Sequence, residues 1–122
     1  MSNIMFQTID WKNIEKIMYI GNTGNASWQT LQFEGLRLRL VEYSANYAAN
    51  HWCEKGHIVH CLEGEFETEL ESGEKSILSG GMSYIVSDYM SSHRSVCKTG
   101  AKLLIIDGDF LTKKYDNNLF IS

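Results

Sequence analysis

The sequence contains no proline, only three cysteines and no long apolar run. Because proline is absent, the ten glycines must supply most of the turns. No stretch approaches the roughly 20 apolar residues that a membrane-spanning helix needs, so no membrane partner is expected. The first residues lack a basic region followed by an apolar one, which predicts no secretory signal and a cytoplasmic protein.

The three cysteines are Cys53, Cys61 and Cys97. An odd number in a chain without a signal does not predict a disulfide framework, and free thiols or a metal-bound thiolate fit better. A basic excess is also lacking, since 11 Lys and Arg stand against 15 Asp and Glu. Nucleic-acid-binding proteins usually present a basic face, so no nucleic-acid partner is expected.

The length of 122 residues and the 43% hydrophobic content are typical of one globular domain over residues 1–122. Residues 10–18 predict one short helix, with Asp10 as its cap. We expect a barrel over about residues 28–108 and a C-terminal extension over 109–122.

The barrel region reads as short strands with turns every 8–12 residues. Residues 36–43, for example, alternate leucines with Arg37 and Arg39, which is the period of a half-buried strand. About eight strands in this spacing predict an antiparallel sandwich or barrel. The expected strands are 28–33, 36–43, 58–62, 65–71, 75–78, 83–87, 93–99 and 102–107.

Residues 50–57 read Asn-His-Trp-Cys-Glu-Lys-Gly-His and concentrate metal-binding side chains. On a strand, His51 and Cys53 share a face because they are two residues apart. The connection 54–56 ends in glycine and suits a hairpin loop, which would place Cys53 directly opposite His57. Imidazole and thiolate both bind zinc, so the cluster predicts a metal site. The alternative is that these residues only pack in the core.

Further candidates come from the rest of the chain. His93 is the natural fourth ligand, because it follows a strand and a polar loop. His60 has the opposite parity to His57 on its strand, so we expect it to point away from the site. Residues that could line a pocket are Trp52, Cys61, Tyr84 and Cys97, although buried thiols are a simple alternative for the two cysteines.

The segment from His51 to Gly64, followed by Gly81 to His93, resembles the two cupin motifs. The first motif has His-x-His, then a glutamate and, after a strand, a glycine. The second begins at a glycine and ends in a histidine. This resemblance covers roughly residues 30–107 and implies an all-β cupin-type antiparallel double-stranded β-helix, or jelly roll. It also implies a metal held by His51, Cys53, His57 and His93.

The segment 50–57 is similar to the DHCW-motif cupin proteins, in which the motif reads Asp-His-Trp-Cys along the chain. That group is functionally uncharacterised, so the resemblance implies a fold and a site without a reaction. Asn50 replaces the group's aspartate, and Cys53 and His57 stand where cupins usually carry histidine and glutamate. The softer ligand set favours a divalent transition metal, with Zn as first choice and Fe(II) as second.

Three functions stay open. The first is a metal-dependent oxygenase, isomerase or lyase acting on a small molecule. The sequence names no clear general base for it, and Glu54 and Tyr84 are candidates. The second is a non-catalytic small-molecule or redox-sensing module, in which Cys53 is oxidised. The third is a structural domain without metal. A homodimer could form through Ile58 and Leu62, with His60 between them.

Overall fold

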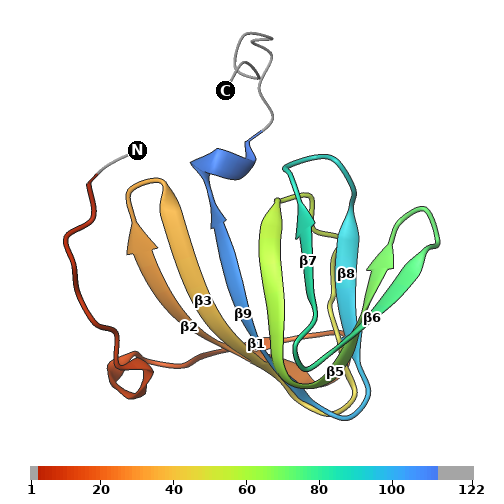
Figure 1. Ribbon diagram of the computed structural model, residues 1–122. Helices are drawn as coiled ribbons and strands as arrows, with labels where there is room; N and C mark the ends of the chain where they lie inside the picture. The colour runs from red at the N-terminus through yellow and green to blue at the C-terminus, as the bar shows by residue number, and fades with distance from the viewer. Residues whose placement is uncertain (1–2, 113–122) are drawn as a thin grey trace, which may run out of the picture.

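The computed structural model describes residues 3–112 and is built almost entirely from antiparallel β-strands (Figure 1). The strands of this part of the chain are β1 (Ile17–Ile20), β2 (Asn25–Phe33), β3 (Leu36–Tyr43), β4 (Tyr47–Ala48), β5 (His57–Leu70), β6 (Lys75–Ser79), β7 (Ser83–Val86), β8 (His93–Cys97) and β9 (Ala101–Gly108). Two single-turn 3-10 helices, η1 (Trp11–Asn13) and η2 (Asp109–Leu111), complete it. The predicted all-β fold class is confirmed.

Strand β5 belongs to both sheets and curls them around one core. Its first residues pair with β9 and β7, which extends the sheet formed by β1, β2, β3 and β9. Its last residues pair with β6 and β8, and β8 continues to β4. The bend lies at a register shift between Cys61 and Glu63, as expected for a β-bulge. The two expected strands 58–62 and 65–71 are therefore one strand.

Gly64 allows this bend. Its φ of 80° lies in the left-handed region, and a Cβ there would collide with the backbone carbonyl oxygen of Gly100. The expected turn at residues 63–64 is therefore a kink within β5, where only glycine fits without strain.

The predicted helix over residues 10–18 is wrong beyond its first turn. Asp10 does cap η1, where its carboxylate accepts a hydrogen bond from the backbone N–H of Lys12 at 3.1 Å. Residues 17–20, however, form β1 and pair with β2. An isolated helix of nine residues is marginal in water, whereas this apolar segment gains a partner strand by extending.

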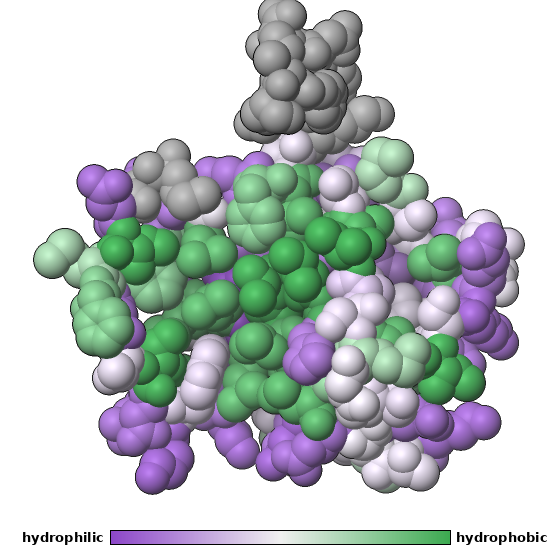
Figure 2. All heavy atoms as spheres, viewed as in Figure 1, coloured by the Kyte–Doolittle hydropathy of each residue, from purple (hydrophilic) through white to green (hydrophobic). Residues whose placement is uncertain are grey.

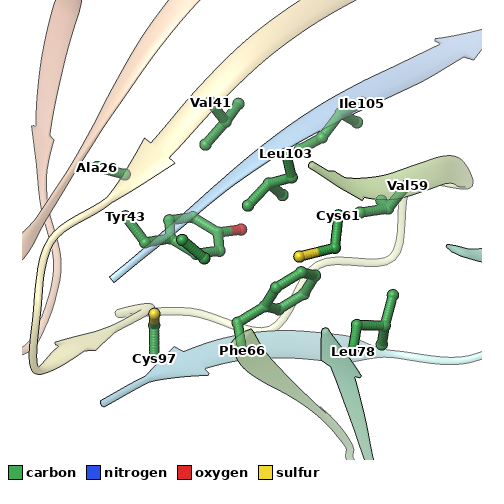
Figure 3. Close-up of a cluster of buried hydrophobic side chains, with 11 residues drawn as sticks. Ala26, Val41, Tyr43, Val59, Cys61, Phe66, Leu78, Cys97, Leu103 and Ile105 are labelled. Atoms are coloured by element: carbon green, nitrogen blue, oxygen red, sulfur yellow. The ribbon is translucent and has the colours of Figure 1, made fainter. Parts of the chain in front are cut away.

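The core between the sheets is small and apolar (Figure 3). It includes Cys61 and Cys97, which are free thiols within the described residues and are almost completely buried. These two cysteines belong to the same cluster of buried side chains as Phe66 and Leu103. They are therefore core residues, which favours the simple alternative of buried thiols.

The alternation of β3 is confirmed, but its buried face carries the arginines. Arg39 is only 4% exposed and shares the inner face with Val41 and Tyr43. The leucines of β3 point outward and stay half-buried among their neighbours. They belong to an outer apolar face that Figure 2 shows as a continuous hydrophobic area over the strands β2, β3 and β9. We define this face by Leu31, Phe33, Leu36, Leu38, Leu40, Ile58, Ile85, Leu104 and Ile106.

Within residues 3–112 no helix has the length and apolar character needed to cross a membrane. Of the predicted C-terminal extension, residues 109–111 form η2, and residues 113–122 lie outside the described residues.

Candidate functional site

Cys53 and His93 face each other across an isolated antiparallel β-bridge. The backbone N–H of Cys53 donates to the carbonyl of His93 at 2.8 Å, and the N–H of His93 donates to the carbonyl of Cys53 at 3.0 Å. Directly opposed residues on antiparallel strands project from the same face. This bridge brings the thiol and the imidazole together, although 39 residues lie between Cys53 and His93 in the sequence.

His57 completes the group from the first position of β5. Its Nε2 lies 3.6 Å from the Cys53 Sγ, and its ring centroid lies 5.2 Å from that of His93. One ligand atom from each of the three residues lies within 4.8 Å of the other two. Both histidines are buried and Cys53 is partly exposed, so the three donors form a small cup that opens toward solvent at the thiol.

Hydrogen bonds fix which ring nitrogens are free. His93 Nδ1 lies 3.0 Å from the carbonyl oxygen of Ser91, so that nitrogen must donate a proton. His57 Nδ1 likewise lies 3.3 Å from the carboxylate of Asp107. Both Nε2 atoms are then left as lone-pair donors, and that of His93 is buried without a hydrogen-bond partner. A histidine held at Nδ1 by a carboxylate or a carbonyl is the usual arrangement of a metal ligand.

The distances fit a metal ion. Zn–S and Zn–N bonds of about 2.3 and 2.0–2.1 Å at a tetrahedral angle put sulfur and nitrogen about 3.6 Å apart. The Cys53–His57 separation has this value. The buried Nε2 of His93 accepts no hydrogen bond, so its lone pair is free to bind a metal ion. A set of one thiolate and two imidazoles fits a borderline divalent ion.

The surroundings of Cys53 favour its thiolate. Burial raises the pKa of the thiol, but its interactions with the His57 and His93 rings and with the backbone of Lys55 outweigh this and lower it to about 5. Burial also acts against the charged form of His57, yet Asp107 and the Cys53 thiolate raise the pKa of His57 above its ordinary value. The metal-free site thus stabilises a thiolate beside an imidazole.

We expect Cys53 of the metal-free protein to react with iodoacetamide in a pH profile centred near pH 5, because only the thiolate attacks. A cysteine with an unperturbed pKa gives a profile centred at about pH 8.5. The measurement is the labelling rate between acidic and neutral pH, read by mass spectrometry. Cys53→Ser is the control and should remove this phase, since burial raises the pKa of Cys61 and Cys97. A Cys53 profile centred above pH 8 would contradict the described hydrogen bonds.

A buried ionic cluster lies directly behind His57. Asp107 Oδ2 accepts hydrogen bonds from Arg37 Nη2 and Arg39 Nη2, each at 2.9 Å, and also from His57. Arg37 Nε donates to the other carboxylate oxygen at 3.0 Å. Burial opposes the charge of Asp107, but these donors hold its pKa well below the usual range. Burial and the neighbouring Arg37 lower the pKa of Arg39.

The sequence alone does not predict this cluster. Two signals for it exist in the chain: an aspartate that interrupts the apolar run of β9, and two arginines on one side of a half-buried strand. Neither signal shows that the aspartate and the arginines are partners, because Arg37 and Asp107 become neighbours only through the pairing of β3 with β9.

The three donors open into a cavity of about 200 Å³ between the two sheets. Its walls combine cationic and aromatic groups, among them Trp28, Arg37, Arg39, His51, Tyr84 and Arg94. Burial raises the pKa of Tyr84 far above its ordinary value, so this hydroxyl stays protonated. Tyr84 can therefore donate a hydrogen bond in the cavity, but it cannot act there as a base at neutral pH.

His51 lies apart from the three donors. It is exposed on a loop at the rim of the cavity, where its Nδ1 is 2.7 Å from the Asn50 side-chain oxygen. The structure thus brings together Cys53, His57 and His93 of the four expected ligands, and it leaves His51 outside the group within 4.8 Å.

The expected hairpin between Cys53 and His57 does not form. Residues 54–56 run along the loop that follows β7, where Asp88 accepts a hydrogen bond from the Gly56 N–H and the Glu54 carbonyl accepts one from Tyr89. Gly56 is needed for close packing, because a Cβ there would lie 2.6 Å from the Val86 carbonyl oxygen. Cys53 is opposite His93, and His57 is opposite Val86.

The remaining candidates lie outside the cavity. Trp52 stacks against the Arg94 guanidinium, whose carbon lies 4.7 Å from the centroid of the Trp52 ring. Glu54 accepts a hydrogen bond from Ser92 and is not among the residues that line the cavity, so it has no place as a base there. His60 points away from the site, as its parity predicts, and its ring lies 2.7 Å from the Ser83 hydroxyl.

Comparison with known proteins places the fold. No family model and no curated protein matches the sequence. Among solved structures, the polyketide cyclase RemF from Streptomyces resistomycificus has a TM-score of 0.72 at 17% identity, over 85% of this chain and 80% of that one. Ectoine synthase from P. lautus has a TM-score of 0.71 at 17% identity, over 89% and 80%. An RmlC-like cupin from Shewanella frigidimarina has a TM-score of 0.66 at 21% identity, over 85% and 91%. At these identities the likeness shows a shared fold and no shared activity.

Proposed function

We propose that this chain, which has the cupin fold, binds a divalent transition metal through Cys53, His57 and His93 and holds a small molecule in the adjoining cavity. The observation that carries this proposal is the buried His93 Nε2. It has a lone pair but no hydrogen-bond partner, and it faces a thiol and a second imidazole that are already spaced as ligands. Leaving such an atom buried and unpaired costs about 1–3 kcal/mol, which a bound ion would remove.

Zn is the first candidate and Fe(II) the second. A thiolate with two imidazoles is a borderline-soft set, which disfavours Mg and Mn. Three protein ligands leave a coordination position open, as in zinc sites where the ion contacts a water or a substrate. His51 stands at the rim and is our candidate for a fourth, more weakly held ligand. The resemblance of residues 50–57 to the DHCW-motif cupins stays a prediction from the motif.

When bound, such an ion polarises an oxygen atom of a ligand in the cavity. The chain's own residues do the rest. Asp107 holds the His57 ring with Nε2 toward the site, and the Ser91 carbonyl does the same for His93. Tyr84 lines the cavity and is kept protonated by burial, so its hydroxyl is available as a hydrogen-bond donor to a bound ligand. These roles are compatible with an enzyme and equally with a binding protein, and we propose no reaction.

Cobalt substitution tests the proposal. Co(II) added to the metal-free protein should bind at one equivalent. The complex should show a thiolate-to-metal charge-transfer band in the near ultraviolet, and d–d bands in the visible that are typical of a low-symmetry site. Zn(II) should then displace it. Binding without the thiolate band would remove Cys53 from the ligand set. Absence of any stoichiometric binding would contradict the metal proposal and favour a structural domain.

A redox-responsive site is the second candidate function. Cys53 is a free and partly exposed thiol with a pKa of about 5. These properties would make it the most readily oxidised cysteine of the described residues, and in a reducing cytoplasm it would normally stay reduced. Cys61 and Cys97 are buried and have raised pKa values. Cysteine oxidation at Cys53 in the absence of metal binding would favour this candidate.

We further propose that the outer apolar face pairs with the same face of a second copy. Five neighbouring strands at about 4.8 Å spacing and about 3.3 Å per residue give a face on the order of 600 Å². A standard interface buries about 800 Å² per partner, so this face with its rim has a suitable size. Glu42, Glu63 and Lys102 form a polar rim at one end, and the His60 ring inside the face already contacts Ser83. A face that meets its own copy needs only a twofold axis.

Ile85→Glu should convert the dimer into a monomer. Ile85 is 68% exposed on this face, so the glutamate would stay in solvent in the monomer, whereas its charge would be buried in the dimer. The measurement is mass by light scattering at micromolar concentration. Ile77→Glu is the matched control, since Ile77 is 56% exposed on β6, in the other sheet, and should leave the mass unchanged. A monomeric unmodified protein would contradict the proposed interface.

A further inference from the structure

The cationic wall of the cavity has more positive charge than its internal partners neutralise. Arg37 and Arg39 share a single carboxylate, that of Asp107. Two guanidinium groups are charged at any physiological pH, so the trio carries a net charge of about +1. Arg39 is 4% exposed, and a buried charge is costly unless it is paired.

One donor of this wall is also unused. Arg39 Nε is buried and has no hydrogen-bond partner, whereas Arg39 Nη2 donates to Asp107. The Trp28 ring covers the face of the guanidinium, with the Arg39 carbon 4.5 Å from the ring centroid. Stacking of this kind leaves the in-plane N–H groups free. The side chains of Trp28, Arg37 and Arg39 all line the cavity.

The other cations around the cavity have partners of their own. Arg94 Nε donates to Glu69 at 2.8 Å, and Lys55 lies 3.9 Å from Asp88. Cys53, which also lines the cavity, has His57 as its partner at 3.6 Å. The unbalanced charge therefore belongs to the Arg37–Arg39 pair. This pair is linked to the metal ligands through one atom, because Asp107 Oδ2 accepts from both arginines and from His57.

From the unpaired donor, the surplus charge and the cavity, we infer that Arg37 and Arg39 form an anchor for the carboxylate of a small organic acid bound in this cavity. A guanidinium presents its donors in a planar fork that matches a carboxylate. A carboxylate bound at the two arginines would also balance their surplus charge of about +1.

The cavity limits the size of this acid. A volume of about 200 Å³ corresponds to about six or seven waters at about 30 Å³ each, and it lies below the range of cavities for drug-sized ligands. An acid of a few carbon atoms fits this space, with its carboxylate at the arginines and its other end toward the three metal donors. This inference deepens the proposed small-molecule binding. It depends on the proposed metal site only for the far end of the ligand.

Calorimetric titration of the metal-free protein with succinate tests the anchor independently of the metal. We expect succinate to bind with a dissociation constant of about 1 mM or tighter and its neutral analogue succinamide not to bind, because only the acid supplies the missing acceptor. Arg39→Lys keeps the charge but loses Nε and the planar fork, and should weaken succinate binding by about tenfold or more. Circular dichroism of this variant establishes that it is folded.

If Arg39→Lys does not fold, Arg37→Gln serves as the second variant, because the Arg37 side chain is 29% exposed and tolerates replacement better. It should likewise weaken succinate binding by about tenfold, through loss of the surplus charge. Equal affinities for succinate and succinamide, no binding of succinate, or binding of inorganic phosphate in preference to succinate would each overturn the inference. Succinate binding without zinc binding would instead overturn the metal proposal alone, and zinc binding without succinate binding would overturn the anchor alone.

Discussion

Cys53→Ser and His57→Ala should each weaken zinc binding by about 100-fold or more, because each removes one of the three proposed ligands and residues 3–112 offer no buried substitute. His51→Ala should have a smaller effect, of about tenfold, since His51 lies at the rim and outside the group of three. The measurement is competition for zinc against a chromophoric chelator of known affinity. The order of the three effects matters more than any single value.

His60→Ala is the matched control for these variants. His60 lies on the same strand as His57, three residues along, but it points to the opposite face and contacts Ser83. Its replacement removes a histidine from the chain without touching the candidate site, so zinc affinity should stay unchanged. A loss of affinity in His60→Ala equal to that in His57→Ala would show that the zinc binds on the surface and not in the cavity.

Asp107→Leu should destabilise the protein by about 3–5 kcal/mol, because it leaves the guanidinium groups of Arg37 and Arg39 without their shared carboxylate. It should also lower zinc affinity by about 10–100-fold, since the His57 ring loses the acceptor that orients it. Urea denaturation measures the first effect, and the competition assay measures the second.

Glu69→Gln is the control for Asp107→Leu. The Arg94–Glu69 pair has similar hydrogen-bond geometry at 2.8 Å but is more exposed to solvent, so its loss should cost less than about 1 kcal/mol. The double variant Arg39→Met, Asp107→Leu should regain part of the stability, because apolar groups of similar volume often replace a buried ion pair without loss. A cost for Asp107→Leu as small as that for Glu69→Gln would contradict the buried cluster as described.

The sequence predicted the strands well because a half-buried strand has a period that local composition reveals. Strand β3, for instance, has the predicted bounds of residues 36–43. The inner face of β3 could not be predicted, since leucines on one side and arginines on the other normally indicate buried leucines. Here Asp107 comes from a strand more than sixty residues away and makes the arginine side the inner one.

The candidate site was predicted in its residue types but not in its geometry. Cys53 and His57 are close in the sequence, and the expected hairpin between them gave a simple reason for their proximity. In the structure the partner of Cys53 is His93, through a bridge between segments that no local pattern connects. His51 is near Cys53 in sequence, yet it turns to the rim because residues 50–52 form a loop and not a strand.

The position of β9 has a consequence for how the chain is made. Strand β9 is the last strand of the described residues, and it lies in the middle of its sheet, between β3 and β5 (Figure 1). During synthesis β2 and β3 emerge early and pair as a hairpin, but the far edge of β3 has no partner until residues 101–108 leave the ribosome. Until then the nascent chain carries an open strand edge beside apolar side chains, the state in which chaperones protect a growing protein.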